Sequence, residues 1–395
     1  DAKTQTFRHF MHDAKNSNSL INNSIQSIAE DDNHNLWIGT ENGGLSIYTY
    51  AWEQFFSYKH DDVDNTSLTG NSVDIITKDR HGNMWIGVYG GGLNLYKKNT
   101  GNFIHYKHNS LPNSLSNDFV LSLFEDDDYN IWVGTDGGGM DVFNLKKNSF
   151  TTFRHQDGNK NSIAGDNVLD IKQDDQKNLW IGTWGNGVSV MNPKTGTFRS
   201  FRHDPADPKS LSGDNVYAIL QTPDKRIWLG TFGDGLNLYD PNSNSFTHFK
   251  NDPANPKSLG SDRINAMLCD SKGNFWLATD DAGLCLFDRK SYTFTSFKHD
   301  DSRNSISNNT VFDIYEDHSG RIWICTLGGL DVFDLKTKHF TIYKTKDGLP
   351  NDYVQSILED DKGHMWVSTN NGLSMFDPVT LKCRNFTTED DLQAD

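Results

Sequence analysis

The sequence predicts an all-β fold, a β-propeller of four-stranded antiparallel blades made from eight repeats. Tryptophans recur at spacings of 43 to 48 residues. Each Trp lies in the same short motif. Aliphatic residues flank the Trp, and a small residue and then glycines follow it. The eight are Trp37, Trp85, Trp132, Trp180, Trp228, Trp276, Trp323 and Trp366. This period is typical of propeller blades and is longer than that of most helical repeats.

One repeat, residues 210–250, shows the expected strands in order. Hydrophobic alternation in this repeat is broken at fixed places by turns rich in Pro, Asp, Gly and Asn. This pattern is typical of short antiparallel strands, and no segment has the length and 3.6-residue period of a helix. The four strands are expected at 216–220, 227–231, 236–239 and 246–249.

The second strand of each repeat is expected to pack between blades. A blade that is apolar on both faces cannot bury them alone, so the copies must stack around an axis. The Trp of this strand is the expected packing residue, because one large aromatic buries on the order of 150 to 250 Å². A small residue follows two positions later, which allows close approach of a neighbouring blade. It is Gly39, Gly87, Gly134, Gly182 and Gly230, then Ala278, Cys325 and Ser368.

Residues 1–395 are expected to form a single propeller domain, and eight blades are the favoured prediction. A leading outer strand is expected at 6–10, where it could close the ring or lie loose. The alternative is a closed ring of seven blades with one extra blade. That blade would expose large apolar faces, which is unfavourable in water.

The repeat wording resembles a known family. Phrases such as "NLWIGTENGGLSIY", "RIWLGTFGDGLNLYD" and "RIWICTLGGLDVFD" are preceded by D-x-x-G-N and followed by a Phe-rich strand. They are similar to the two-component regulator propeller repeat, and the resemblance covers essentially the whole chain. That family supplies the extracytoplasmic sensor region of hybrid two-component histidine kinases in Bacteroidota, where paired propellers precede a small sandwich domain, a membrane helix and the kinase.

The resemblance implies a periplasmic sensor segment that recognises a glycan-derived oligosaccharide and regulates polysaccharide utilisation through transcription. This segment would not be an enzyme and would need no cofactor. Its partners would be the oligosaccharide and the remaining sensor and kinase domains of the same polypeptide, dimeric at full length. The opening "DAKTQTFRHF" matches the end of a blade, which predicts that the chain was cut from a longer two-propeller array.

Composition excludes some partners. The formal net charge is -16 at pH 7, which disfavours nucleic acid. No apolar run approaches the roughly 20 residues that span a bilayer, so no membrane contact is expected for this segment. Cys269 and Cys285 are expected about two strand spacings of 4.8 Å apart, too far for a disulfide. Together with Cys325 and Cys383 they are expected to be small core residues.

Ligand-site candidates are departures from the repeat, because positions common to all blades are explained by packing. The loop after the second strand and the residue before each first strand are expected on one face of the disc, where the central channel opens. Aromatic rings there can stack on sugar rings, while acids bind hydroxyl groups. The candidates are Trp184 first, then Tyr89, Phe232, Phe119, Tyr353, Arg263, Asp280 and Asp281.

Two interpretations remain open at these positions. Arg263 could bind a carboxylate or sulfate on a sugar, or pair with a rim acid such as Asp262 or Asp281. Each aromatic could stack on ligand or pack against the next loop.

No catalytic or metal-binding residue is predicted. A recurrent F-x-x-[FY]-[KR]-H phrase places histidines on the outer strand, where those of different blades are too far apart to share a metal. The acidic run 125–128 occupies an ordinary turn and lacks the spacing of a calcium loop. Asp280 and Asp281 are adjacent and show no opposed acid for glycoside cleavage.

Three functional classes therefore remain, since fold alone cannot separate them. A sensor predicts binding without turnover. An enzyme, by analogy with propeller lyases and glycan-active propellers, predicts a product. A protein-interaction scaffold of a secretion system predicts a protein partner and no affinity for sugars.

Overall fold

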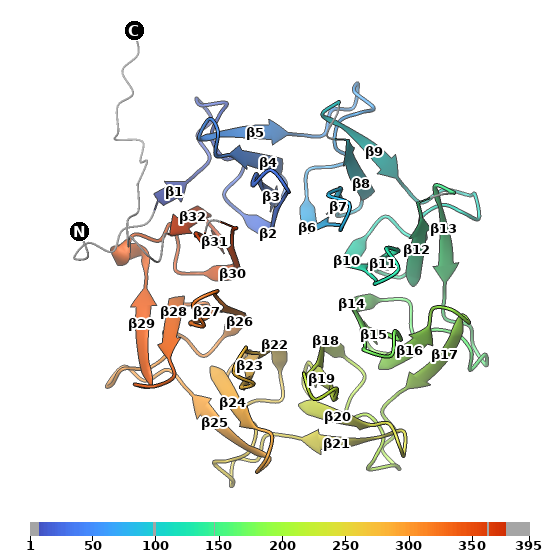
Figure 1. The fold of residues 1–395 in the computed structure, drawn as a ribbon, viewed down its shortest axis with the longest axis vertical. Coiled ribbons are helices and arrows are strands. Elements are labelled where there is room, and N and C mark those ends of the chain that lie inside the picture. The colour runs from blue at the N-terminus through green and yellow to red at the C-terminus, as the bar shows by residue number, and fades with distance from the viewer. Residues whose placement is uncertain (1–7, 98–99, 146, 362, 377–395) are drawn as a thin grey trace.

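Thirty-two strands form eight four-stranded sheets arranged as a ring in the computed structural model, which describes residues 8–97, 100–145, 147–361 and 363–376 (Figure 1). The first strand of each blade lines the central opening and the last lies at the circumference (Figure 1). The predicted eight-bladed propeller is therefore confirmed. The described residues contain one 3-10 turn, η1 (Thr345–Asp347).

The blades follow the chain in order. Blades 1 to 4 comprise β2 (Ile25–Glu30), β3 (Leu36–Thr40), β4 (Gly44–Thr49), β5 (Gln54–Tyr58); β6 (Val73–Lys78), β7 (Met84–Val88), β8 (Gly92–Lys97), β9 (Asn102–Tyr106); β10 (Val120–Glu125), β11 (Ile131–Thr135), β12 (Met140–Asn144), β13 (Ser149–Phe153); and β14 (Val168–Gln173), β15 (Leu179–Thr183), β16 (Val188–Asn192), β17 (Thr197–Phe201). Blades 5 to 8 comprise β18 (Val216–Gln221), β19 (Ile227–Thr231), β20 (Leu236–Asp240), β21 (Ser245–Phe249); β22 (Ile264–Cys269), β23 (Phe275–Thr279), β24 (Leu284–Asp288), β25 (Thr293–Phe297); β26 (Val311–Glu316), β27 (Ile322–Thr326), β28 (Gly329–Asp334), β29 (His339–Tyr343); and β30 (Val354–Glu359), β31 (Met365–Thr369), β32 (Gly372–Phe376) with β1 (Arg8–Phe10).

The N-terminal strand β1 completes blade 8. It pairs antiparallel with β32, so that Phe10 lies opposite Leu373. The Phe10 ring stacks on Trp366 of the same blade at 5.7 Å and contacts Phe55 of blade 1 at 5.0 Å. The ring is thus closed by non-covalent strand pairing between its first and last segments, and the alternative of seven blades plus one extra is wrong.

The tryptophans pack between blades as predicted. Trp276 of blade 6 is fully buried in one apolar cluster with Val311, Ile324 and Phe333 of blade 7. The small residue two positions on is also explained: a Cβ at Gly182 would lie 2.8 Å from the Val216 carbonyl oxygen of the next blade. Ala278, Cys325 and Ser368 at the same position are fully buried, which confirms that small size is what the position requires.

The indole Nε1 of each of these Trp residues also donates a hydrogen bond to a side chain in the turn before it, a contact that was not predicted from the sequence. In blade 3 the Asp126 carboxylate accepts a 2.8 Å hydrogen bond from Trp132 Nε1 and further bonds from the Asp128 and Asn130 amides, both at 2.9 Å. The acid of the D-x-x-G-N turn therefore folds the turn and satisfies a buried indole at the same time. Thr222 replaces it in blade 5 and accepts from Trp228 Nε1 at 3.2 Å.

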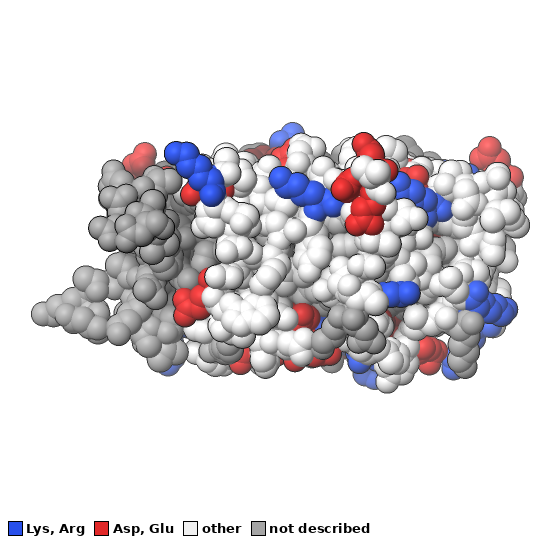
Figure 2. Space-filling model, turned by 90° about the horizontal axis from the view of Figure 1, so that it is seen from above, with Lys and Arg blue, Asp and Glu red and all other residues white. Residues whose placement is uncertain are grey.

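The molecule is a flat disc, and charged side chains of both signs gather towards its two faces (Figure 2). No helix among the described residues is long and apolar enough to cross a membrane.

The cysteines correct one prediction. Cys285 and Cys325 carry free thiols in the core, as expected. Cys269 is only half-buried, because it ends a first strand where the chain enters its turn, so it is not a core residue. Cys383 lies outside the described residues.

The recurrent histidines fold the connections between blades. The Nδ1 atom of His203 lies 2.8 Å from the Leu211 carbonyl oxygen, and its backbone amide donates to Asp214. Equivalent bonds join His60, His108, His155 and His299 to the connection that follows each of them. In blade 5 the position holds Asn251, whose Nδ2 donates to the Leu259 carbonyl at 2.9 Å. The role is therefore structural, as expected.

Asn251 shows that an amide can replace the imidazole, which gives a testable prediction. We expect His203→Asn to change the free energy of unfolding by less than about 0.5 kcal/mol, whereas His203→Ala costs about 1 kcal/mol through the lost hydrogen bond. Urea unfolding of both variants checks this. Equal losses would mean that ring packing, rather than the Nδ1 bond, is what His203 contributes.

Candidate functional site

The two sets of loops that the sequence placed on one face are hydrogen-bonded to each other. In every blade the backbone amide of the residue after the second strand donates to the backbone carbonyl of the residue before the first strand of the same blade. Trp184 donates to Asn167 in this way, and Phe232 to Asn215, both at 3.0 Å. The fold therefore fixes the backbone of these positions around the mouth of the channel.

A bulge adds a third position to this face. The first strand of each blade pairs with the second strand, and the register of this pairing shifts at the second residue of the first strand. In blade 5 the shift lies between Val216 and Ala218. A bulge leaves that residue out of the ladder and re-aims its side chain. We call the three positions together the inner rim: the loop residues Glu41, Tyr89, Asp136, Trp184, Phe232, Asp280, Leu327 and Asn370; the preceding residues Ser24, Ser72, Phe119, Asn167, Asn215, Arg263, Thr310 and Tyr353; and the bulge residues Gln26, Asp74, Leu121, Leu169, Tyr217, Asn265, Phe312 and Gln355.

Three aromatic side chains of blades 4 and 5 come together on the inner rim. The ring centroids of Trp184 and Tyr217 are 6.3 Å apart, those of Tyr217 and Phe232 5.6 Å, and those of Trp184 and Phe232 6.3 Å. Trp184 and Tyr217 are each 43% exposed. We call these three residues the aromatic platform. The three rings pack against one another and still present ring surface to solvent, so the packing interpretation is confirmed, and stacking on a ligand stays a prediction.

Arg263 closes one end of the platform. Its guanidinium carbon lies 5.8 Å from the centroid of Phe232, and a backbone bridge joins the same two residues. Its Nη1 atom lies 3.4 Å from Asp280 Oδ2. Pairing with a rim acid, one of the two interpretations of Arg263, is therefore confirmed, but the acid is Asp280 and not Asp262 or Asp281, the two given as examples. Asp262 Oδ1 instead accepts the Asn251 amide at 2.7 Å. Asp281 is exposed.

The remaining aromatic candidates form two separate pairs. Tyr89 and Phe119 join blades 2 and 3 with centroids 4.8 Å apart. Tyr353 of blade 8 stacks on Phe312 of blade 7 at 4.8 Å. The structure thus brings Trp184, Phe232, Arg263 and Asp280 together. It places Tyr89, Phe119 and Tyr353 elsewhere on the same rim, and the side chain of Asp281 is exposed beside Asp280.

Tyr217 and Phe312 were missed from the sequence. Both are bulge residues, whereas the predicted candidates lay only in the loop after the second strand and just before the first strand of each blade. A large aromatic second in a first strand, where other blades carry Gln, Asp, Asn or Leu, was the available signal.

The inner rim of blades 1 and 2 is acidic. Burial and the nearby carboxylate of Glu41 raise the pKa of Asp74 to about 6. Arg263 is the one basic residue among the inner-rim positions, which also hold Glu41, Asp74, Asp136 and Asp280.

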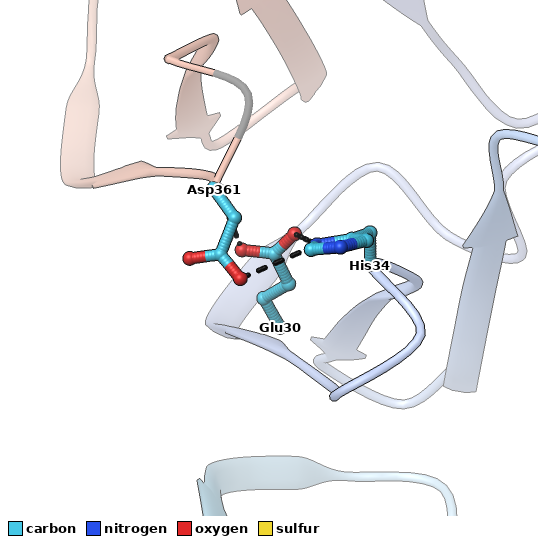
Figure 3. Close-up of side chains that lie close together, drawn as sticks. All are labelled: Glu30, His34 and Asp361. Atoms are coloured by element: carbon cyan, nitrogen blue, oxygen red, sulfur yellow. Dashed lines mark hydrogen bonds and ion pairs between the residues drawn. The ribbon is translucent and has the colours of Figure 1, made fainter.

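On the other face, Glu30, His34 and Asp361 meet where blade 8 joins blade 1 (Figure 3). His34 Nδ1 lies 3.3 Å from Glu30 Oε1 and 3.3 Å from Asp361 Oδ2, and Glu30 accepts the Asp361 amide at 2.9 Å. The same positions join other blades, for example through the Arg80 amide and Glu125 at 2.8 Å. We therefore assign this cluster to blade packing.

A second network strengthens the same junction. Tyr50 of blade 1 donates across it to the Asp360 carboxylate, which also accepts from Trp366 Nε1 at 2.8 Å. Burial alone would raise the pKa of Asp360, but hydrogen bonds from His364, Tyr50 and Trp366 hold it at about 2. The ring closure thus combines strand pairing with charged hydrogen bonds.

The two component regulator propeller profile matches seven of the repeats, at residues 19–42, 114–137, 162–185, 210–233, 258–281, 305–328 and 341–371. Each matched segment spans the hydrogen-bonded loops described above.

The chain belongs to the two component regulator propeller family.

Several solved structures are similar to this regulator propeller. One is described as the extracellular domain of a hybrid two component system of B. thetaiotaomicron, with 19% identity over 93% of this chain and 70% of that one, and a TM-score of 0.39. PorZ, a surface component of the type-IX secretion system of Porphyromonas gingivalis, has 18% identity over 93% of this chain and 55% of that one, and a TM-score of 0.57. Virginiamycin B lyase of Staphylococcus aureus has 14% identity over 76% of this chain and 92% of that one, and a TM-score of 0.52.

At these identities the likeness to PorZ and to the lyase shows the fold alone. The regulator propeller spans 60% of a second extracellular domain from B. thetaiotaomicron and little more than half of PorZ. The lyase shares the propeller, whereas the repeat profile is that of two component regulators. No curated protein matches the sequence.

Proposed function

We propose that this propeller is the ligand-sensing segment of a hybrid two-component sensor histidine kinase and response regulator, on the periplasmic side of the inner membrane. Its ligand would be a glycan-derived oligosaccharide, bound without cleavage, and its output the regulation of polysaccharide utilisation. Residues 1–395 would be one propeller domain of a longer two-propeller array. The remaining sensor and kinase domains would be its partners in a dimer.

The aromatic platform carries this proposal. Trp184, Tyr217 and Phe232 depart from the repeat, lie in contact with one another and remain partly exposed at the mouth of the channel. Aromatic faces of this kind stack on the apolar C–H faces of sugar rings, and adjacent amides and acids can bind hydroxyl groups. A bound sugar changes signalling if it binds one arrangement of the sensor domains more tightly than another.

Calorimetric titration against a panel of plant and host oligosaccharides tests the proposal. We expect saturable binding that weakens about tenfold in Trp184→Ala, because one stacking contact is worth about 1.5 kcal/mol. Trp52→Ala is the matched control. Trp52 is 67% exposed in the turn between β4 and β5, away from the inner rim, and its loss should leave the affinity unchanged.

Chromatography of each mixture after titration separates the competing functions. Intact sugar with the expected difference between the two Trp variants supports a sensor. Cleaved sugar would establish an enzyme, and absence of binding across the panel would favour a protein-interaction scaffold. Equal losses in Trp184→Ala and Trp52→Ala would place the binding surface elsewhere.

A further inference from the structure

We propose that the aromatic platform takes an uncharged oligosaccharide, and that Asp280 sets this preference by neutralising Arg263. The inference rests on the proposed function and names the ligand class of the same site. It starts from the position of Arg263: the equivalent residue is Ser, Asn, Thr or an aromatic in the other seven blades. Arg263 is thus the one inner-rim group that could attract a carboxylate or sulfate.

Asp280 is held beside Arg263 by its backbone as well as its side chain. The Asp280 amide donates to the Arg263 carbonyl at 3.2 Å, and the Asp280 carbonyl accepts from Thr310 Oγ1 at 2.7 Å. These bonds anchor Asp280 from its own blade and from the next one. Its side chain, 31% exposed, therefore presents the carboxylate to the guanidinium before any ligand arrives.

The rest of the inner rim offers an anion no further cation. Arg263 lies at the Phe232 end of the platform, where substituents of a stacked sugar would project. Its charge is balanced by Asp280, and the other charged inner-rim residues, Glu41, Asp74 and Asp136, are acidic. Those three acids belong to blades 1 to 3, so at the platform itself the Asp280 carboxylate is the group that disfavours an anion. Specificity here therefore arises from rejecting anions as much as from binding neutral sugars. An exposed ion pair is weak as a source of stability, but it still removes a free cation from the site.

The experiment compares oligosaccharides that share a backbone and differ in charge. Suitable pairs are oligogalacturonate with its full methyl ester, and a sulfated oligosaccharide with its desulfated form. We expect the wild-type protein to bind the neutral member of a pair more tightly than the charged member. Asp280→Asn should raise the affinity for the anionic member about tenfold, and this gain should shrink as salt is added.

Two controls make the result specific. Asp281→Asn removes the same charge one residue away, at an exposed side chain outside the platform, and should change the affinity for the anion less than twofold. The double variant Arg263→Gln with Asp280→Asn should lose the gain. Circular dichroism and thermal unfolding establish that each variant is folded.

The outcomes separate this inference from the proposed function. Neutral-sugar binding without a gain in Asp280→Asn, or an equal gain in Asp281→Asn, would overturn the role of Asp280 and leave the sensor function standing. Tighter binding of the anionic member by the wild-type protein would overturn the assignment of ligand class. Absence of binding by every variant to every pair would overturn the inference together with the proposed function.

Discussion

Asp126→Ala should lower the free energy of unfolding by about 2 to 4 kcal/mol, one of the largest effects of any single polar substitution in this propeller. Asp126 is almost fully buried and accepts hydrogen bonds from the Trp132 indole and from two backbone amides of its turn. Removing it leaves buried donors without an acceptor, and such donors cost their full desolvation energy. Thermal and urea unfolding followed by Trp fluorescence measure the loss.

A control lies in the same turn. Asp128 is exposed and contributes its backbone amide to the turn, so Asp128→Ala should cost less than about 0.5 kcal/mol. Asp126→Thr should fall between the two, because Thr222 fills this place in blade 5 with one hydrogen bond to its Trp. If Asp126→Ala and Asp128→Ala lose the same stability, the indole bond is not what anchors the blade.

This anchor shows what the repeat could and could not predict. The pattern of Trp, glycines and turns predicted blade number and strand order, because each is repeated eight times and each depends on local chemistry. Residues 210–250 illustrate the accuracy: the strand expected at 216–220 ends one residue later, at Gln221, and the one expected at 227–231 is found there. The Asp-to-indole bond was missed, although the acid and the Trp keep a constant separation. Two residues at a constant separation along the chain indicate a contact only when the turn that brings their side chains together is recognised.

The residues of the candidate site could be predicted where they differ from the residues at the same position in the other blades. Trp184, Phe232 and Arg263 were found in this way, and the rim they share follows from antiparallel strand order. Their partners were harder to assign. Arg263 pairs with Asp280, whereas Asp262 binds the amide of Asn251. Which acid a side chain meets depends on three-dimensional packing, which the spacing of residues along the chain does not reveal.

Tyr217 was missed for a different reason. Alternation along a strand would point the second residue of β18 to one face of the sheet, but the bulge between Val216 and Ala218 re-aims it. Bulges of this kind leave little trace in composition. The platform therefore became visible as a three-residue surface only in the structure.

Asp331→Asn should stabilise the propeller by about 2 to 4 kcal/mol above neutral pH and change its stability little near pH 4. Asp331 lies fully buried on β28, where Oδ2 accepts from the Ser307 amide at 2.8 Å and from its hydroxyl at 2.9 Å. Oδ1 is buried without a hydrogen-bond partner. Burial raises the pKa of Asp331 to about 7 against these bonds and against the nearby charges of Lys344 and His299.

The sign of the pH dependence follows from this shift. The unfolded chain releases the Asp331 proton near its ordinary pKa of about 4, whereas the folded chain keeps it until about 7. Between these values the folded state binds more protons, so wild-type stability falls as the pH rises, and the deficit is complete above the folded pKa. Asparagine does not titrate, so the difference between Asp331→Asn and wild type should grow through this window and then level off.

The chain contains its own precedent for this substitution. Asn237 fills the same place in blade 5, where Oδ1 accepts the Ser212 amide at 2.9 Å and Nδ2 donates to the Ser212 hydroxyl at 2.8 Å. Asp141 in blade 3 supplies the control: its second oxygen accepts from Thr152 Oγ1 at 2.5 Å, so Asp141→Asn should gain less. Unfolding midpoints measured from about pH 4 to about pH 9 test both variants across the window. A gain for Asp331→Asn that does not vary with pH would show that packing, rather than the buried charge, limits the stability of this blade.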